Sequence, residues 1–309
     1  MKILVTGGAG FIGSHVVDRY VAQGHQVVVV DNLSTGRGEF VNPGATLHVA
    51  DIRSPRLAKI FDAERPEAVN HLAAQMDLRR SVVDPGFDAQ VNILGTLNLL
   101  ECARRSSVKR LIFASTGGAI YGDGAEPPTP EDHPTRPASP YGIAKLAVEH
   151  YLACWEALYG IRTLALRYAN VYGPRQNSAG EAGVVAIFAH RLVTGGAAVI
   201  NGDGEQTRDY VFVDDVAEAN QRALERRDLS GAMNIGTGIE TSVNELFRQL
   251  ARAADARAEP RHGPPKPGEQ RRSALDSSLA KRLLDWTPRV SLDEGLRRTV
   301  DDVKRGGSA

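Results

Sequence analysis

Short runs rich in Val, Ile and Leu alternate along the chain with longer segments in which apolar residues recur every three or four positions. The short runs are typical of buried strands, and the longer segments are typical of helices with one apolar face. A repeated strand–helix–strand order predicts an α/β fold with a doubly wound parallel sheet, covered by helices on both faces. The predicted strands are residues 2–6, 26–30, 46–50, 68–72, 109–115 and 161–168, and the predicted helices lie near 12–24, 54–63, 87–106 and 141–158.

The regular alternation ends after "NVYGPRQ", residues 170–176. The rest of the chain is richer in Gly and Pro, and it predicts a smaller C-terminal α+β domain over residues 173–309 that follows a first domain over 1–172. Residues 209–236 are apolar enough to return to the main sheet, so we expect the two domains to interleave. Helical periodicity in this half lies near residues 184–194, 214–227, 242–254, 276–284 and 292–303.

Composition narrows the range of partners. The 309 residues include 37 Lys and Arg and 37 Asp and Glu, so no global field favours nucleic acid. No stretch approaches the ~18 apolar residues of a membrane helix, which predicts a cytoplasmic protein without a membrane partner. Cys102 and Cys154 lie in apolar helical contexts and are predicted to be small core residues. No cysteine or histidine has metal-ligand spacing, so no metal is expected.

A glycine-rich stretch, "VTGGAGFIGSH" at residues 5–15, follows the first predicted strand and opens the first predicted helix. In that position its glycines fit the dinucleotide-binding pattern of a Rossmann fold. A side chain at Gly7 or Gly10 would block the tight turn and keep a pyrophosphate from the helix N-terminus. One at Gly13 would hold the helix off the strand.

Two aspartates stand where the second and third predicted strands end. Asp31 lies 18 residues beyond Gly13, where a carboxylate accepts hydrogen bonds from the adenosine ribose and repels a 2′-phosphate. Asp51 is placed for the adenine edge. Together the glycines and the two acids predict a bound dinucleotide, with NAD favoured over NADP.

Tyr141 and Lys145 lie four residues apart in "SPYGIAKL", on one face of a predicted helix. A phenol is a poor base at neutral pH, but a nearby ammonium and the positive oxidised nicotinamide both favour the phenolate. We therefore interpret Tyr141 as a catalytic base. Lys145 is interpreted as the residue that tunes this base and bonds the nicotinamide ribose.

A hydroxyl group is also expected between the substrate oxygen and the phenolate. The predicted strand at 109–115 runs into Ser115 and Thr116. A hydroxyl at this place can donate to an alkoxide while it accepts from the phenol. We favour Thr116 over Ser115 as the direct contact with the substrate, while the alternative that both merely close the strand into a turn stays open.

The chain resembles the extended short-chain dehydrogenase/reductase superfamily, and within it the UDP-glucose 4-epimerases and their sugar-nucleotide relatives. Single motifs are shared widely in this superfamily, but the ordered set is specific and extends over essentially all 309 residues. The motifs are "TGGAGFIG" (6–13), "DNLSTG" (31–36), "NHLAAQ" (70–75), "VNILGTLNLLE" (91–101), "YGIAK" (141–145), "LRYANVYGPRQ" (166–176) and "RDYVFVDDVA" (208–217).

The resemblance implies two sets of binding residues. A basic residue of the 266–272 loop would bind the diphosphate, and Lys266, Arg271 and Arg272 are alternatives for this role. Ser273 aligns with a position that limits pocket size beside the sugar, and its small side chain predicts room for an N-acetyl group. The implied NAD contacts are Phe11, Ile12, Asp31, Asn32, Asp51, Ile52, Ala73, Gln75, Asn92, Tyr141, Lys145 and Tyr168, and the implied UDP-sugar contacts are Asn170, Val184, Val185 and Arg208.

The resemblance also implies a reaction. Related dehydratases and decarboxylases place acidic residues after the strand-end Thr, where this chain has Gly117 and Gly118. Their absence favours plain 4-epimerisation of UDP-hexoses, glucose with galactose and also the N-acetylated pair, with NAD retained. The alternatives are a UDP-glucuronate 4-epimerase, a nucleotide-keto-sugar reductase and an NAD-binding sensor without catalysis. A homodimer packed through the helices near 87–106 and 141–158 is implied as well.

Overall fold

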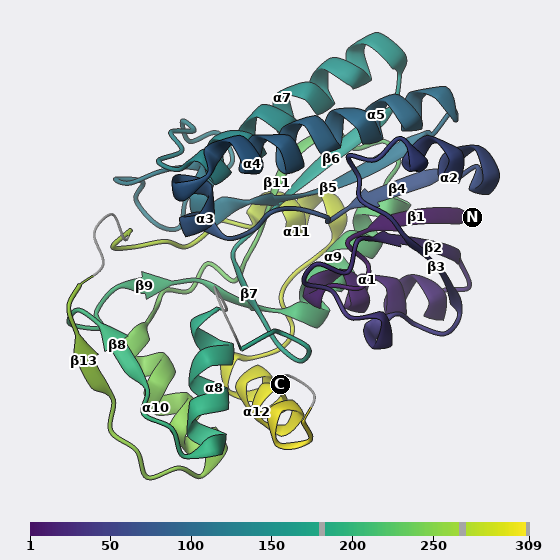
Figure 1. Cartoon of the computed structure of the whole chain (residues 1–309). Helices are drawn as coiled ribbons and strands as arrows, with labels where there is room; N and C mark the ends of the chain where they lie inside the picture. The colour runs from purple at the N-terminus through teal and green to yellow at the C-terminus, as the bar shows by residue number, and fades with distance from the viewer. Residues whose placement is uncertain (179–182, 266–269, 307–309) are drawn as a thin grey trace.

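The main sheet of the protein has seven parallel strands. Our computed structural model describes residues 1–178, 183–265 and 270–306 (Figure 1). The strands are β1 (Lys2–Thr6), β2 (Gln26–Asp31), β3 (Ala45–Val49), β4 (Ala68–His71), β5 (Arg110–Thr116), β6 (Arg162–Tyr168) and β11 (Gly231–Ile235). Their order is β11-β6-β5-β4-β1-β2-β3, so the direction of winding reverses between β1 and β4. In such sheets ligands bind outside the carboxyl ends of the strands at this reversal.

Helices cover both faces of this sheet, as predicted for a doubly wound fold (Figure 1). One face packs against α1 (Phe11–Ala22), α9 (Val213–Glu225) and α11 (Ser278–Leu284), with Val16, Val17 and Val216 in its core. The other face packs against α2 (Arg56–Glu64), α5 (Gly95–Arg105) and α7 (Pro140–Tyr159). The strands are apolar along their whole length because both faces of the sheet are buried. Burial of each Val, Leu or Ile side chain contributes roughly 1.5–3 kcal/mol to the free energy of folding.

The chain leaves the main sheet after β6 and returns to it much later. After β7 (Asn170–Tyr172) it builds the smaller part of the molecule, and β10 (Tyr210–Phe212) then leads through α9 into β11. β11 pairs in parallel with β6, so that Ile235 is opposite Tyr168. The edge strand β11 therefore comes late in the sequence, after much of the smaller part of the molecule.

The smaller part combines helices with short strand pairs. Its core contains Phe188, Phe247 and Leu296, where α8 (Val184–Thr194), α10 (Val243–Ala254) and α12 (Leu292–Lys304) pack together. The strand pairs are β7 with β10, β8 (Val199–Asn201) with β13 (Arg261–Gly263), and β9 (Thr207–Arg208) with β12 (Thr241–Ser242). The fold class predicted from sequence, a doubly wound parallel sheet with a smaller α+β part, is confirmed.

The predicted helix at 87–106 is interrupted. It consists of α4 (Pro85–Ala89), a π-helical turn η2 (Gln90–Leu94) and α5, and it is preceded by a separate short helix, α3 (Leu78–Val83). Asp84 ends α3 and caps α4 by accepting a hydrogen bond from Phe87 N. A single π turn adds one residue to a helix without changing which residues are apolar, so spacing could not reveal it. Two further short helices are η1 (Gly38–Phe40) and α6 (Gly117–Ile120).

Helix α7 exposes an apolar stripe on the side that faces away from the sheet. Ile143, Tyr151, Cys154 and Leu158 are all exposed, at helical spacings that place them on one face. The expectation that Cys154 is a core residue is therefore wrong, while Cys102 is buried as predicted.

In the described part of the chain, no helix has the length and apolar character needed to span a bilayer.

Candidate active site

The glycine-rich turn joins β1 to α1 at the carboxyl edge of the sheet. Gly7 adopts a φ of +72°, and a Cβ on it would lie 2.7 Å from Ala73 N. A Cβ on Gly13 would overlap the Gly7 carbonyl, 2.8 Å from its carbon atom. Gly10 differs, because the nearest atom to its Cβ would be Gly7 O at 3.2 Å and no other lies within 4 Å. Gly7 and Gly13 are thus required by the turn itself, whereas Gly10 borders open space.

This open space suits a pyrophosphate. Gly10 is the N-cap of the twelve-residue helix α1 and provides no side-chain cap. Phe11 and Ile12 begin the helix, and their N–H groups point out of its positive end. A backbone cradle at a helix N-terminus, left open by a missing Cβ, is a fitting site for the diphosphate of a dinucleotide.

Asp31 fixes the edge of this cradle. It ends β2, is buried, and accepts hydrogen bonds from Ala9 N (3.0 Å) and Leu33 N (2.8 Å). Because a carboxylate has about four acceptor positions, these two bonds leave capacity for ribose hydroxyls. Asp31 therefore also holds the glycine turn against β2, a structural role that the sequence did not indicate.

The residues predicted for the adenine side lie together after β2 and β3. Asn32 Nδ2 donates to Asp51 Oδ2 across 3.1 Å, and Arg53 bonds the two Asp51 oxygens at 2.9 and 2.7 Å. These hydrogen bonds, chiefly from Arg53, lower the pKa of Asp51 to about 2. Ile52 between them is buried. Asn32 and Arg53 thus fix the Asp51 carboxylate in one orientation, and Arg53 balances its charge.

A buried amide network holds the segment that follows β4. Gln75 N donates to Asn92 Oδ1 and Asn92 Nδ2 donates to Gln75 O, both across 2.9 Å. The Asp88 carboxylate accepts from Gln75 Nε2 (2.9 Å) and Asn92 Nδ2 (3.0 Å), and burial raises its pKa. Asn92 lies in the π turn, which aims it at residues 73–75. Sequence reasoning named Ala73, Gln75 and Asn92 but missed Asp88, a buried acid with no motif of its own.

Tyr141 and Lys145 lie in the first two turns of α7, which begins after its cap Ser139. Lys145 Nζ is buried, donates to Ala114 O across 2.8 Å, and lies 5.8 Å from the centre of the Tyr141 ring. Burial lowers the pKa of Lys145 to about 8, against the opposite influence of Asp88 and Glu149. The helix thus brings the phenol and the ammonium together at the end of β5, as the spacing of four predicts.

The pKa of Tyr141 differs from the sequence expectation. Burial raises it above its ordinary value, and the Asp88 carboxylate adds to the increase. The predicted lowering by Lys145 is therefore wrong for the protein alone, because desolvation of a buried phenolate outweighs the nearby ammonium. The positive nicotinamide named in the same argument would be a second source of stabilisation for a phenolate, in addition to the Lys145 ammonium.

The two hydroxyls at the end of β5 face different surroundings. Ser115 Oγ donates to Glu149 Oε1 across 2.6 Å, and Arg167 binds the same carboxylate through Nε (3.0 Å) and Nη2 (2.6 Å). Thr116 is half-buried and makes no side-chain hydrogen bond to any residue that the structure describes. Glu149 was missed, although it lies four residues beyond Lys145, the same spacing that links Lys145 to Tyr141.

The side chain of Tyr168, the last residue of β6, points into the core. Its hydroxyl exchanges hydrogen bonds with the Asn220 side chain (2.8 and 3.0 Å), in the core between the sheet and the helices α1 and α9. Alternate residues of a strand point to opposite faces, and the side chain at 168 points into this core. The hydroxyl is therefore committed to Asn220, and the contact with NAD that the resemblance implies would have to be made by another part of Tyr168. The Val185 side chain is likewise in the core of the smaller part, so only its backbone remains for a ligand.

The predicted substrate contacts converge on the start of β7. Asn170 N donates to Asp209 O across 2.9 Å, which places Asn170 beside the residue that follows Arg208. Gln176 Nε2 donates to Val171 O and would lie 2.7 Å from a Cβ on Gly183, so the start of α8 at Val184 lies beside β7.

The basic candidates for the diphosphate remain alternatives. Arg271 forms two hydrogen bonds to Asp203 (2.8 and 2.9 Å), and Arg272 forms two to Glu240 (3.0 and 2.6 Å). The Arg271 pair is exposed on both sides, whereas Arg272 is exposed and its partner Glu240 is half-buried. Exposed pairs contribute little stability, so Arg271 in particular can exchange its carboxylate for phosphate. Lys266 lies outside the described residues. Ser273, predicted beside the sugar, is buried.

Comparison with known proteins shows the family to which the chain belongs. Residues 3–236 match the NAD dependent epimerase/dehydratase family. The UDP-glucose 4-epimerase of Mycolicibacterium smegmatis is 47% identical over 306 residues, covering 97% of this chain and 98% of that protein. The chain belongs to the NAD dependent epimerase/dehydratase family.

Two solved structures are similar over almost the whole length. UDP-glucose 4-epimerase from Thermotoga maritima, solved with UDP-glucose, is 50% identical with a TM-score of 0.96. UDP-glucose 4-epimerase from Thermus thermophilus, solved in complex with NAD, is 46% identical with a TM-score of 0.93. Each comparison covers 99% of both chains.

Proposed function

We propose that this protein interconverts UDP-glucose and UDP-galactose by transient oxidation at C4, with NAD retained between turnovers. The observation that carries the proposal is that Tyr141, Lys145 and the uncommitted Thr116 lie at the carboxyl end of β5, on the same edge of the sheet as the glycine turn of β1 and one strand (β4) away from it. NAD supplies the hydride acceptor and donor for C4 when it is bound. The similarity to UDP-glucose 4-epimerases over the full length supports the same reaction.

The chain's own residues would handle the proton and the oxygen. Tyr141 takes the proton of the 4-hydroxyl and returns it after the sugar has turned in the pocket. Thr116 donates a hydrogen bond to the same oxygen as negative charge develops. Lys145, fixed by Ala114 O, keeps positive charge close to the phenol and presents its remaining donors to the nicotinamide ribose.

We assign the dinucleotide to residues 1–172 together with the returning segment 209–236, and the UDP-sugar mainly to 173–309. On the dinucleotide side the glycine turn, Asp31, Asp51 and Gln75 define one continuous edge of the sheet. On the other side Asn170, Arg208 and the start of α8 would bind the nucleotide of the substrate. An Arg guanidinium can form two parallel hydrogen bonds to one phosphate group, which makes Arg well suited to bind a diphosphate.

A second substrate pair is the N-acetylated one. Ser273 is small and buried. The resemblance places it beside the sugar, where a larger side chain would take up volume. We therefore expect UDP-N-acetylgalactosamine to be converted as well.

The test is incubation of the purified protein, without added cofactor, with UDP-galactose, UDP-N-acetylgalactosamine and UDP-galacturonate, followed by separation of the C4 epimers. The proposal expects conversion of the first, without net change in absorbance at 340 nm. Conversion of the galacturonate alone would identify a glucuronate epimerase. Stoichiometric formation of reduced cofactor after NAD is supplied would identify a keto-sugar reductase acting in reverse. Tyr141→Phe serves as the inactive control. No conversion after NAD is supplied would leave a binding protein as the best account.

We also propose that two copies of the chain pair through α5 and α7. The apolar stripe of α7 is exposed, and Leu94 at the start of α5 is 57% exposed. In Figure 1 these two helices lie side by side on the outer layer of the sheet. Exposed apolar side chains that follow two adjacent helices are typical of an interface with a second copy of the same helices.

A further inference from the structure

Four residues near the C-terminal end of the chain form a buried segment, here called the strap (Ser273–Asp276). Ala274 O accepts from Thr129 N and Asp276 N donates to Thr129 O, both across 2.9 Å. Leu275 N donates to Asp209 Oδ2 across 3.2 Å. The strap is therefore tied to the residue next to Arg208 and to the loop that follows α6.

The strap also contacts the end of the catalytic strand. A Cβ placed on Gly117 would lie 2.6 Å from Leu275 Cδ2, closer still to Cδ1, and 3.0 Å from Cγ. Gly117 follows Thr116 directly, and its φ is not in the left-handed region, so the glycine is needed for space and not for conformation. Leu275 is 1% exposed and fills the volume that a side chain at 117 would need.

The neighbouring Gly118 is different. It is exposed, and a Cβ on it would meet no atom closer than Thr116 Oγ1 at 4.0 Å. The two glycines that replace the acids of related dehydratases therefore have separate roles. Gly117 admits Leu275, and only Gly118 leaves open space beside the hydroxyl of Thr116.

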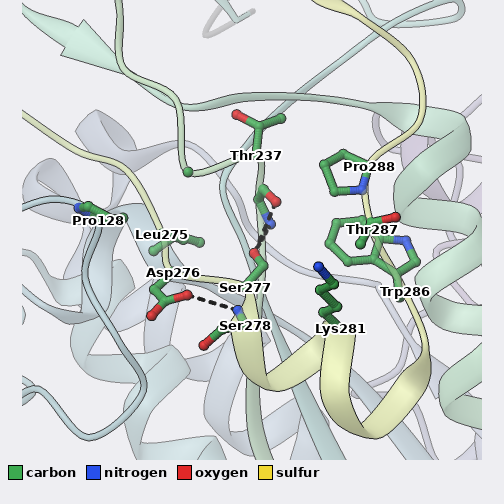
Figure 2. Close-up of a pocket in the computed structure, with 12 residues that line it drawn as sticks. Pro128, Thr237, Leu275, Asp276, Ser277, Ser278, Lys281, Trp286, Thr287 and Pro288 are labelled. Carbon is green, nitrogen blue, oxygen red and sulfur yellow. Dashed lines mark hydrogen bonds between the residues drawn. The ribbon is translucent and has the colours of Figure 1, made fainter.

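Leu275 also borders a surface cavity of about 220 Å³ (Figure 2). Figure 2 shows Thr237, Asp276 and Lys281 around this cavity, together with Leu275. A strap that borders a cavity has room to move when it is pushed from the side of Gly117. Ser273 is two residues from Leu275 in the same strap, so such a movement would change its distance from Thr116.

We propose that the contact between Gly117 and Leu275 sets the distance between Thr116 and the strap, and so determines the preference for plain or N-acetylated UDP-hexoses. The inference rests on the proposed function and deepens it. Ser273 alone does not define the width of the sugar pocket, because its position depends on how deeply Leu275 seats against the strand end.

The experiment is a double-mutant cycle with Gly117→Ala, Leu275→Ala and the double variant in the full-length protein with NAD. The measured quantity is kcat/KM for UDP-N-acetylgalactosamine divided by kcat/KM for UDP-galactose. A methyl group at 117 displaces the strap outward, so this ratio should rise about tenfold in Gly117→Ala, the scale of one methylene in a pocket. In the double variant the shortened side chain makes room for the methyl, and the ratio should return to within about threefold of wild type.

Gly118→Ala is the matched control, because its methyl adds the same volume one residue away without touching Leu275. Any change that it causes should persist when Leu275→Ala is added. A purely structural role for Gly117 would lower the melting temperature and reduce kcat/KM equally for both substrates. An unchanged ratio in folded Gly117→Ala, or no recovery in the double variant, would overturn the inference. Failure of the wild-type protein to convert either substrate would instead overturn the proposed function.

Discussion

Ser115 Oγ donates a hydrogen bond to Glu149 across 2.6 Å, and this contact separates the roles of the two hydroxyls that end β5. Arg167 pairs with the same carboxylate, and both ionic side chains are less than 10% exposed. A buried ion pair depends on its additional hydrogen bonds for stability. Ser115 therefore supports the strand end, and Thr116 is the hydroxyl left for the substrate.

This difference predicts opposite effects for two similar substitutions. Thr116→Val should lower kcat by about 10²-fold, the cost of one donor to a developing oxyanion, with little change in stability. Ser115→Ala should keep most of kcat but lower the free energy of unfolding by about 1–3 kcal/mol, because a hydrogen bond to a buried charge is lost. Steady-state kinetics and chemical denaturation of both variants check this. Loss of kcat in Ser115→Ala at unchanged stability would reverse the assignment.

The lowered pKa of Lys145 predicts a pH-dependent stability. Its pKa is about 8 in the folded protein and 10.5 ordinarily, so the unfolded chain binds the proton more tightly than the folded protein between these values. Stability from this group therefore rises with pH across that window. Compared with Lys145→Met, the cofactor-free wild type should gain about 2–3 kcal/mol of unfolding free energy between pH 8 and 10.5.

Denaturation of both proteins at several pH values measures this gain. The control is Lys59→Met, which removes an exposed ammonium on α2 and should leave the pH dependence of wild type unchanged. Parallel curves for Lys145→Met and wild type would mean that the buried ammonium keeps its ordinary affinity for the proton.

The glycines of the turn predict a separation of folding from binding. Gly13→Ala places a methyl on the Gly7 carbonyl and should destabilise the protein by several kcal/mol, as overpacking against rigid backbone does. Gly10→Ala meets only one atom, at 3.2 Å, so the protein should fold but bind NAD at least about tenfold more weakly. Thermal melting and titration with NAD distinguish the two. Equal losses of stability would show that Gly10 is structural as well.

The exposed stripe on α7 predicts that a charge will separate the proposed dimer. Leu158→Glu should convert the protein to a monomer in sedimentation experiments, because a buried unpaired carboxylate is costly at an interface. Val199→Glu is the matched control, since Val199 is 50% exposed on β8 in the other half of the molecule. Both variants should keep the secondary structure of wild type. If the wild-type protein sediments as a monomer, the proposed dimer is wrong.

Sequence predicted the regular elements well where the periodicity is simple. The predicted helix at 184–194 coincides with α8, and the predicted strand at 2–6 coincides with β1, because each buries one clear apolar pattern. The π turn at Gln90–Leu94 and the short strand pairs of the smaller part carry no comparable signal.

Site residues could be predicted where their spacing in the sequence places them on one face of a helix, as for Tyr141 and Lys145. They could not be predicted where tertiary packing decides. The hydroxyl of Tyr168 turned out to bond Asn220 in the core, and Leu275 meets Gly117 across 158 positions of sequence. The pKa of Tyr141 was misjudged for the same reason, since the degree of burial depends on elements that the motif does not contain.

The pairing of β11 with β6 has a consequence for the synthesis of the chain. Until residues 231–235 have left the ribosome, β6 is an unpaired edge strand and α1 lacks its partner α9. A nascent chain that ends near residue 172 therefore exposes a long apolar edge of the kind that joins other chains. Residues 1–172 alone lack both the edge strand of the sheet and the partner helix of α1. The main sheet is complete only after the first elements of the smaller part of the molecule have been made.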